Sequence, residues 1–277
     1  MAHKDLSGTH IKMFFPRKRE SFLPFFKIPV FTGKAGRGLL LFLIACIFLS
    51  TAQAANFNET SADLPKLRAA RLPDIQKKFD KKNLLLGAPV YIRIFKNEQL
   101  LELWVQGPDR KTYKLFQTYS ICYSSGTLGP KLKEGDHQAP EGFYSVTQDW
   151  MHPNSQFYLA FNIGFPNAFD KAHERTGSAL MVHGGCKSTG CFSMRNRIMG
   201  EIYLIMEKHF QANGPETPVP VHIFPFRMTK ENMDKAIQYY PQWMPFWLNL
   251  KEGYDLFETT HIPPAPVVTD MKYGFTK

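Results

Sequence analysis

The sequence predicts a mainly β fold with peripheral helices, an α+β domain whose core is a β-sandwich or a barrel. From about residue 89 of the 277-residue chain, short runs rich in β-branched and aromatic residues alternate with loops marked by glycine and proline. Helical periodicity is confined to the segments near residues 196–211 and 229–257. Hydrophobic residues make up 44% of the chain, which is enough for one core of ordinary size.

The strands follow a polar lead-in. Residues 55–85 hold too few apolar residues for more than a short surface helix, Pro73–Lys82 at most. Turn signals at Asn97-Glu98 and Ser124-Ser125-Gly126 separate the strand candidates, and the polar segment 131–141 is expected to be a mobile loop. The predicted strands are Val90–Phe95, Leu100–Val105, Tyr113–Ile121, Gly142–Gln148, Tyr158–Ile163, Ala179–Val182 and Val219–Phe226.

Three helices follow or interrupt these strands. In Asn196–Gln211 the apolar residues recur near 3.6-residue spacing, and Asn213-Gly214 ends the pattern. Thr229 is expected to cap a helix that runs to Tyr239, and Pro245–Phe257 is the third candidate. Residues 229–277 therefore form a C-terminal helical extension, with an extended Pro-rich tail after His261.

Residues 1–54 have the layout of an export signal. A basic region precedes the eleven-residue apolar run Leu39–Leu49, and Ala52-Gln53-Ala54 follows it as a cleavage site. Because a transmembrane helix needs about 20 apolar residues, a cleaved signal is favoured over an uncleaved anchor in the inner membrane. Translation from Met13 and a lipoprotein site at Cys46 are further interpretations. The expected location is the periplasm, with membrane contact only through this segment.

The charge distribution agrees with this division. Residues 1–38 hold eight Lys and Arg against two acidic residues, so they carry +6 of the net charge of +10. The high pI therefore comes mostly from the segment expected to stay on the cytoplasmic side of a membrane. No Arg-rich stripe interleaved with aromatics occurs after residue 56, so nucleic acid is not an expected partner.

Met181–Met194 contains the residues of a thiol-dependent active site. A free cysteine is mostly protonated at neutral pH, and a nearby imidazole can remove its proton. Cys191 is the candidate nucleophile, because Gly190 permits a tight turn and a helix begins just downstream. His183, at the end of a strand, is the candidate base. Gly190 and Cys191 supply backbone N–H groups for an oxyanion hole, Ser188 supports the loop, and Gly184 leaves room for substrate or for a carbonyl that orients the imidazole ring.

Other interpretations of the same residues remain open. Cys122, Cys186 and Cys191 are an odd number of cysteines for an exported chain, which implies at least one free thiol. Cys186 and Cys191 are able to form a structural disulfide, as in a non-catalytic, membrane-anchored wall-binding module. His183, Cys186 and Cys191 are three possible zinc ligands without an evident fourth. A papain-like protease would need His209 or His222 as its base.

The segment His183-Gly184-Gly185-Cys186, continued by Ser188-Thr189-Gly190-Cys191, resembles the signature of the L,D-transpeptidase catalytic (YkuD-like) family, and its short spacing is similar to the YafK-like subgroup. The resemblance covers about residues 86–228. Further matching segments are Ser125–Lys131, Glu134–Asp136 with Pro140–Tyr144, Phe165–Ala168 and Val221–Met228.

The resemblance implies a mostly β catalytic domain that needs neither metal nor cofactor. Cys191 would attack a carbonyl of a peptidoglycan stem peptide, His183 would take its proton, and a thioester would form. If an amine then attacks the thioester, the enzyme is a transpeptidase. If water attacks it, the enzyme is a hydrolase. The YafK-like subgroup is associated with hydrolysis that frees a lipoprotein from peptidoglycan, so cleavage is the first expectation.

The sequence departs from the wider family two residues after the nucleophile. Many members have arginine where this chain has Ser193, and Arg195 lies two residues further on. Lys187, Arg195 and Lys131 are the alternatives for contacting a substrate carboxylate. Cys122 and Cys186 have no role in this scheme, and reversible pairing of either with Cys191 is one hypothesis.

Overall fold

The computed structural model describes residues 61–276, and its long strands form one five-stranded sheet. Its order is β3 (Tyr113–Ser120), β2 (Leu100–Gln106), β1 (Val90–Phe95), β10 (Val219–Phe224) and β5 (Gly142–Val146). Only β1 and β10 run parallel, and the other pairs are antiparallel. We call this sheet A. Its strands begin and end within a few residues of the predicted positions.

A second five-stranded sheet, sheet B, carries the residues of interest. Its order is β4 (Tyr123–Ser124), β9 (Phe192–Ser193), β8 (Met181–His183), β7 (Ala160–Asn162) and β6 (Met151–His152). Only β7 and β8 correspond to predicted strands. The others are two residues long and were missed, because a pair of residues has no periodicity to detect.

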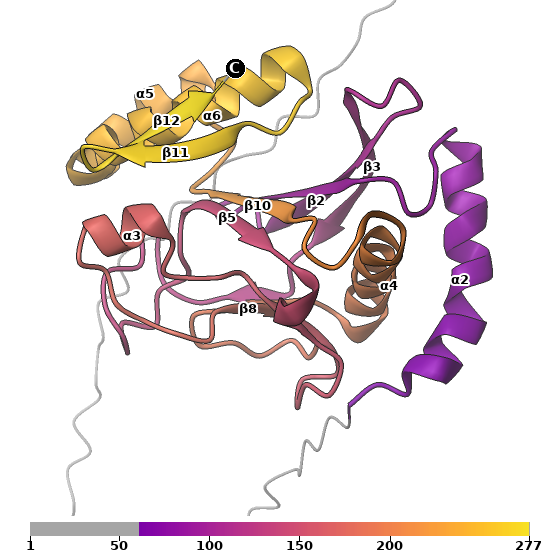
Figure 1. Ribbon diagram of the computed structural model, residues 1–277. Helices are drawn as coiled ribbons and strands as arrows, with labels where there is room; N and C mark the ends of the chain where they lie inside the picture. Colours follow the sequence, from indigo (N-terminus) through magenta and orange to yellow (C-terminus); the bar gives the residue numbers. More distant parts are fainter. Residues whose placement is uncertain (1–60, 277) are drawn as a thin grey trace, which may run out of the picture. The chain divides into compact units, whose positions relative to one another are not determined.

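The centre of sheet A is covered on both faces, so every residue of β1 is buried, whereas the edge strand β3 is partly exposed. Ile92 and Ile94 contribute to a core shared with sheet B and with the helices α2 and α4. Phe95 and Phe224 point to the opposite face, where a second core includes residues of the C-terminal extension. Figure 1 shows the extension on one side of sheet A and α4 on the other. The predicted α+β architecture with peripheral helices is confirmed.

The first described helix corrects the prediction for the lead-in. α2 spans Leu64–Lys81, nine residues more at its start than the expected Pro73–Lys82. Asp63 caps it by accepting a hydrogen bond from the Lys66 amide at 3.1 Å, and a proline sits in its first turn. Pro73 therefore lies inside the helix rather than at its start.

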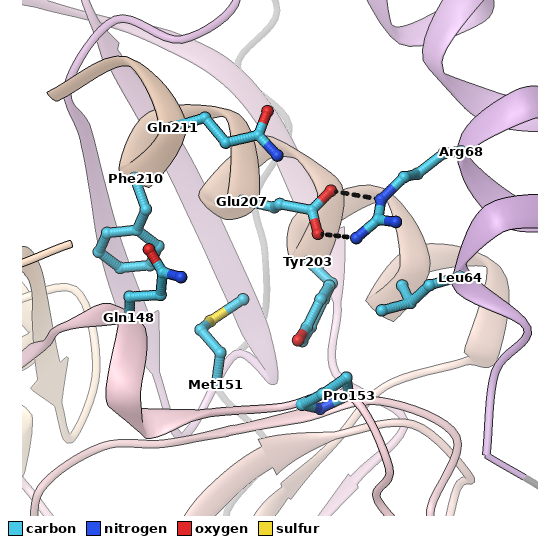
Figure 2. A pocket seen from close by; sticks show the side chains of 9 residues that line it. All are labelled: Leu64, Arg68, Gln148, Met151, Pro153, Tyr203, Glu207, Phe210 and Gln211. Atoms are coloured by element: carbon cyan, nitrogen blue, oxygen red, sulfur yellow. Dashed lines mark hydrogen bonds and ion pairs between the residues drawn. The ribbon is translucent and has the colours of Figure 1, made fainter. Parts of the chain in front are cut away.

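Contacts to α4 (Asn196–Asn213) hold α2 in place despite its low apolar content. Ile75 and Phe79 of α2 are fully buried. Arg68 pairs with Glu207 at 2.5 Å, and Arg71 and Lys78 both pair with Glu201. Figure 2 shows Arg68 and Glu207 side by side at a pocket of about 340 Å³ between the two helices and the β6 segment. Packing between the two helices thus supplies the stability that the few apolar residues of α2 do not provide alone.

The remaining helices are α3 (Ala168–Ala172), which was not predicted, α5 (Lys230–Tyr239) and α6 (Met244–Thr260). Thr229 caps α5 as expected. The tail after His261 is extended, but it also forms the unpredicted hairpin β11 (Ala265–Thr269) and β12 (Lys272–Thr276). Its two-residue turn, Asp270-Met271, has positive φ at both positions, as a type I′ turn requires.

The predicted export signal and anchor at residues 1–54 lie outside the described residues. Within residues 61–276, no helix is both long enough and apolar enough to cross a membrane.

Candidate active site

Cys191 and His183 come from neighbouring parallel strands of sheet B. Cys191 directly precedes β9, and His183 is the last residue of β8. The register pairs Val182 with Phe192 and His183 with Ser193. Because side chains alternate between the faces of a sheet, Cys191 and His183 lie on the same face, offset by two residues. The backbone register thus brings the predicted nucleophile and base to one place.

The thiol of Cys191 is half-buried against the segment that leads into β8. Its Sγ accepts a hydrogen bond from the Met181 amide at 3.4 Å and lies 3.7 Å from the Ala179 carbonyl oxygen. Burial raises the pKa of this thiol, although the Met181 amide, Ser188 and the charge of Lys131 act in the opposite direction. The resting group is therefore a thiol at neutral pH and needs a base before it can attack.

His183 is held in one orientation by its neighbours. The side chain is 3% exposed, and its Nδ1 lies 2.6 Å from the Gly184 carbonyl oxygen. Since a carbonyl only accepts hydrogen bonds, Nδ1 carries a proton, and in the neutral imidazole Nε2 then has the lone pair. The Phe157 ring packs against the imidazole, with 4.8 Å between ring centroids. The ring position and the tautomer are thus both set by neighbouring groups.

The loop 184–190 between the two residues is fixed at both ends. Asn196, the first residue of α4, accepts a hydrogen bond from the Gly185 amide at 2.8 Å. Ser188 donates its hydroxyl to the Cys191 carbonyl at 2.7 Å, and its supporting role in catalysis stays a prediction. The Gly190 amide donates to the hydroxyl of Ser125, a residue that the sequence reading left in a loop.

Gly184 cannot carry a side chain in this arrangement. A Cβ at this position would lie 2.7 Å from both the Asn196 side-chain oxygen and the Phe157 carbonyl oxygen. The conformation after His183 therefore depends on glycine because of close packing, and the residue does more than leave room for a ligand.

The cysteine pairing resolves the alternatives. Cys122 and Cys186 form a disulfide, and Cys191 is the free cysteine of residues 61–276. The Cys186–Cys191 disulfide is therefore wrong, and with it the structural premise of the wall-binding module. A zinc site built from His183, Cys186 and Cys191 is also wrong, because the Cys186 sulfur is already bonded. Cys122 and Cys186 pair with each other, not with the nucleophile.

The segment 131–138, expected to be a mobile loop, has a fixed conformation beside the site. Asp136 accepts hydrogen bonds from the amides of Leu132, Lys133 and Gln138. It also pairs with the buried Lys131 ammonium at 2.5 Å. Although burial acts to raise it, these donors lower the pKa of Asp136 to about 2. The polar residues of this segment thus form hydrogen bonds and an ion pair within the segment, and they are not simply solvated.

Gln138 and Ala139 connect this segment to residues 125–129. The side-chain oxygen of Gln138 accepts from the Thr127 amide at 2.9 Å, and its nitrogen donates to the Thr127 and Gly129 carbonyls. The Ala139 amide bonds the Ser125 carbonyl at 3.2 Å. Ser125 and Gln138 are therefore supporting residues that the sequence analysis missed, since isolated polar residues in a predicted loop give no signal.

The predicted substrate contacts have different environments. Ser193 is fully buried and donates its hydroxyl to the Tyr123 carbonyl at 2.9 Å, so it does not replace an arginine. Lys187 and Arg195 are both exposed, the first in the loop and the second just before α4. Their role in binding stays a prediction.

The histidines considered for a papain-like protease are engaged elsewhere. His222 lies on β10 of sheet A, where its Nδ1 is 2.8 Å from the Tyr91 hydroxyl. The Nε2 of His209, on α4, lies 3.0 Å from the Thr217 carbonyl oxygen. Burial lowers the pKa of both imidazoles. Neither is on sheet B with Cys191.

A pocket of about 390 Å³ opens beside the pair. It is lined by residues 152–157 and Met181. Neither Cys191 nor His183 lines it, but two of its lining residues touch them: the Phe157 ring contacts His183, and the Met181 amide contacts Cys191. No cluster of three or more potential metal ligands occurs among residues 61–276.

These features are the ones that a cysteine enzyme of the acyl-transfer type requires. A thiol, a base with a fixed tautomer and a glycine loop occupy one face of a sheet next to an open pocket. Residues 89–223 match the model of the L,D-transpeptidase catalytic domain, YkuD. A protein of Escherichia coli K12 named "Putative L,D-transpeptidase YafK" is 45% identical over 196 residues, which are 71% of this chain and 77% of that protein. The chain therefore belongs to the L,D-transpeptidase family and is YafK-like.

Similar proteins include the YafK protein of Escherichia coli O157:H7, with the same identity and coverage. Among solved structures, the helical cell shape determining protein Pgp2 from Campylobacter jejuni is 19% identical, with 66% of this chain and 67% of that chain covered and a TM-score of 0.39. Bd1075 of Bdellovibrio bacteriovorus is 23% identical, with 61% and 60% covered and a TM-score of 0.33. Because these TM-scores are below 0.5, the family assignment stands on the sequence matches.

Proposed function

We propose that the protein is an exported acyltransferase that acts on peptidoglycan stem peptides through a thioester at Cys191. The observation that carries the proposal is the placement of the free Cys191 thiol and the Nδ1-protonated His183 on one face of sheet B. Family membership supports the substrate class. The proposal includes the periplasmic location expected from residues 1–54.

In the first half-reaction, the Nε2 of His183 takes the proton of Cys191 as the sulfur attacks a stem-peptide carbonyl carbon. The carbonyl π electrons move onto oxygen, and the tetrahedral oxyanion is stabilised by backbone N–H groups. The Gly190 amide donates to Ser125 in the resting structure, so the Cys191 amide is the first candidate donor. Collapse of the intermediate breaks the amide bond, and the imidazolium gives its proton to the leaving nitrogen.

In the second half-reaction, a nucleophile resolves the thioester. An amine of another stem peptide or protein gives a new amide, and water gives a carboxylic acid. In either case His183 takes a proton from the nucleophile, and the thiol of Cys191 is restored. Cleavage that frees a peptidoglycan-linked lipoprotein or a cross-link is the first expectation, and it needs no metal or cofactor.

The pocket beside the pair is the proposed place for the stem peptide. Its lining holds Asn154, Ser155 and Gln156, which are able to bond peptide groups, and the ring of Phe157. We propose no carboxylate contact by Ser193, since its hydroxyl is committed to Tyr123.

The test is mass spectrometry of muropeptides after the full chain, wild type or Cys191→Ala, is incubated with intact sacculi. Loss of bound protein or of cross-links that depends on Cys191 supports hydrolysis, and new cross-links or attached amines support transfer. Identical muropeptides with both proteins would contradict the proposal. Circular dichroism of the variant checks that it is folded.

A further inference from the structure

The two cysteines that the proposed chemistry does not use form a disulfide on the catalytic loop. Cys186 lies three residues after His183 and five before Cys191. Cys122 lies between β3 of sheet A and β4 of sheet B, 64 residues away in sequence. The bond therefore ties the middle of the loop to the connection between the two sheets.

The same connection holds the loop at other points. The Cys122 amide bonds the Ser193 carbonyl oxygen at 2.8 Å, β4 pairs with β9, and the Ser125 hydroxyl accepts from the Gly190 amide. These contacts all lie on the C-terminal side of the loop. At Cys186 the disulfide adds a covalent tie to the middle of the loop, next to the Gly185 amide that donates to Asn196.

The disulfide is also accessible to a reductant. Cys186 is exposed, whereas Cys122 is half-buried. We therefore expect an incoming thiolate to attack the sulfur of Cys186, with Cys122 as the leaving group. A disulfide buried beneath the sheets would lack this access.

We propose that the Cys122–Cys186 disulfide is a redox-modifiable site that positions the catalytic loop, so that its reduction by a dithiol oxidoreductase slows acylation of Cys191. The proposal rests on the acyl-transfer function proposed above. The positioned element is the backbone from Cys186 to Cys191, which sets the position of the Cys191 amide, the proposed oxyanion donor.

The redox step is thiol–disulfide exchange. One thiolate of the dithiol attacks the sulfur of Cys186, forming a mixed disulfide and releasing the Cys122 thiolate. The second thiol of the reductant then attacks the mixed disulfide and releases Cys186. The reductant becomes a disulfide by losing two electrons, and its two protons end on Cys122 and Cys186.

Two probes of Cys191 separate positioning from general damage. Iodoacetamide alkylates a thiolate without forming an oxyanion, whereas p-nitrophenyl acetate acylates it through a tetrahedral oxyanion. We expect reduction with dithiothreitol, followed by desalting, to slow acylation of Cys191, read by peptide mapping, by about a hundred- to a thousandfold, the cost of losing one oxyanion donor. The rate of alkylation at Cys191, followed by peptide mapping, should change by less than about threefold, since this reaction uses no such donors.

The double variant Cys122→Ser/Cys186→Ser is the matched control. It should acylate as slowly as the reduced wild-type protein, and dithiothreitol should have no further effect on it because no disulfide remains. Wild-type acylation rates in the folded double variant would overturn the proposal. Global unfolding of both the reduced protein and the variant, seen by circular dichroism, would also overturn it, because the bond would then stabilise the whole fold.

These outcomes are independent of peptidoglycan. If the two probes respond differently to reduction but sacculi remain unchanged by the oxidised enzyme, the positioning role stands and the proposed substrate fails. If sacculi are processed equally well by oxidised and reduced enzyme, the substrate stands and the redox site fails.

Discussion

Sheet A and sheet B are held together in different ways. Sheet A has strands of five to eight residues, and β1 is buried throughout. Sheet B has strands of two or three residues and relies on side chains that bond the backbone, such as Asn196, Ser188 and Ser193. We infer that stability comes mainly from the burial of sheet A and catalytic geometry mainly from these side-chain contacts at sheet B, although the two sheets share one core.

The largest expected effect is on the stability of sheet A. Ile94→Ala on β1 removes a fully buried side chain from the core shared with sheet B. We expect it to lower the free energy of unfolding by about 2–5 kcal/mol, and Ile94→Val by about 0.5–1.5 kcal/mol. Urea denaturation measures both changes. A loss of acylation rate per folded molecule would contradict the separation of the two sheets.

The next effect is on the geometry of sheet B. Gly184→Ala places a Cβ against the Phe157 carbonyl and Asn196, so the loop must shift. A displacement near 1 Å at an active site costs about a hundredfold in rate, and we expect a loss of this order in acylation of Cys191. Gly274→Ala on β12, where the nearest atom is 3.9 Å away, is the control and should be silent.

The pH dependence of Cys191 tests the resting state of the pair. Burial raises the pKa of this thiol, so the thiolate is scarcer at neutral pH than in a free cysteine. Alkylation by iodoacetamide should rise about tenfold per pH unit and reach half its maximum above about pH 8.5, the ordinary thiol value. A plateau below pH 7 would instead indicate a resting thiolate and contradict the account of His183 as the base.

The smallest effect comes from one hydrogen bond of the loop. Asn196→Ala removes the acceptor of the Gly185 amide, whereas Asn196→Asp keeps an oxygen there. A lost hydrogen bond of about 1 kcal/mol corresponds to about fivefold in acylation rate. Equal rates in the alanine and aspartate variants would show that this contact does not hold the loop.

The difference between the sheets also explains what the sequence predicted. The long strands of sheet A carry apolar runs and alternation, so Val90–Phe95 was placed within its observed bounds. Strands β4, β6 and β9 have only two residues each and depend on tertiary pairing. The start of α2 was missed because its packing against α4 comes from distant residues.

The residues of the candidate site also fall into those that the sequence identifies and those that it does not. Cys191 and His183 were identifiable because their chemistry and spacing form a motif, and β8 and β9 bring them to one face. The Cys122–Cys186 disulfide was not identifiable, because the pairing of three cysteines cannot be deduced from sequence alone. Ser125 and Gln138 act through contacts across the fold and leave no local pattern.

The most direct test of the central claim is to look for an acyl group on Cys191. The full chain is mixed with a purified stem tetrapeptide, quenched in acid, digested and analysed by mass spectrometry. The account predicts a hydroxylamine-labile acyl adduct on the peptide that contains Cys191, and its absence in Cys191→Ala. Product formation without any adduct in the wild-type protein, or with Cys191→Ala as active as wild type, would contradict thioester catalysis at this residue.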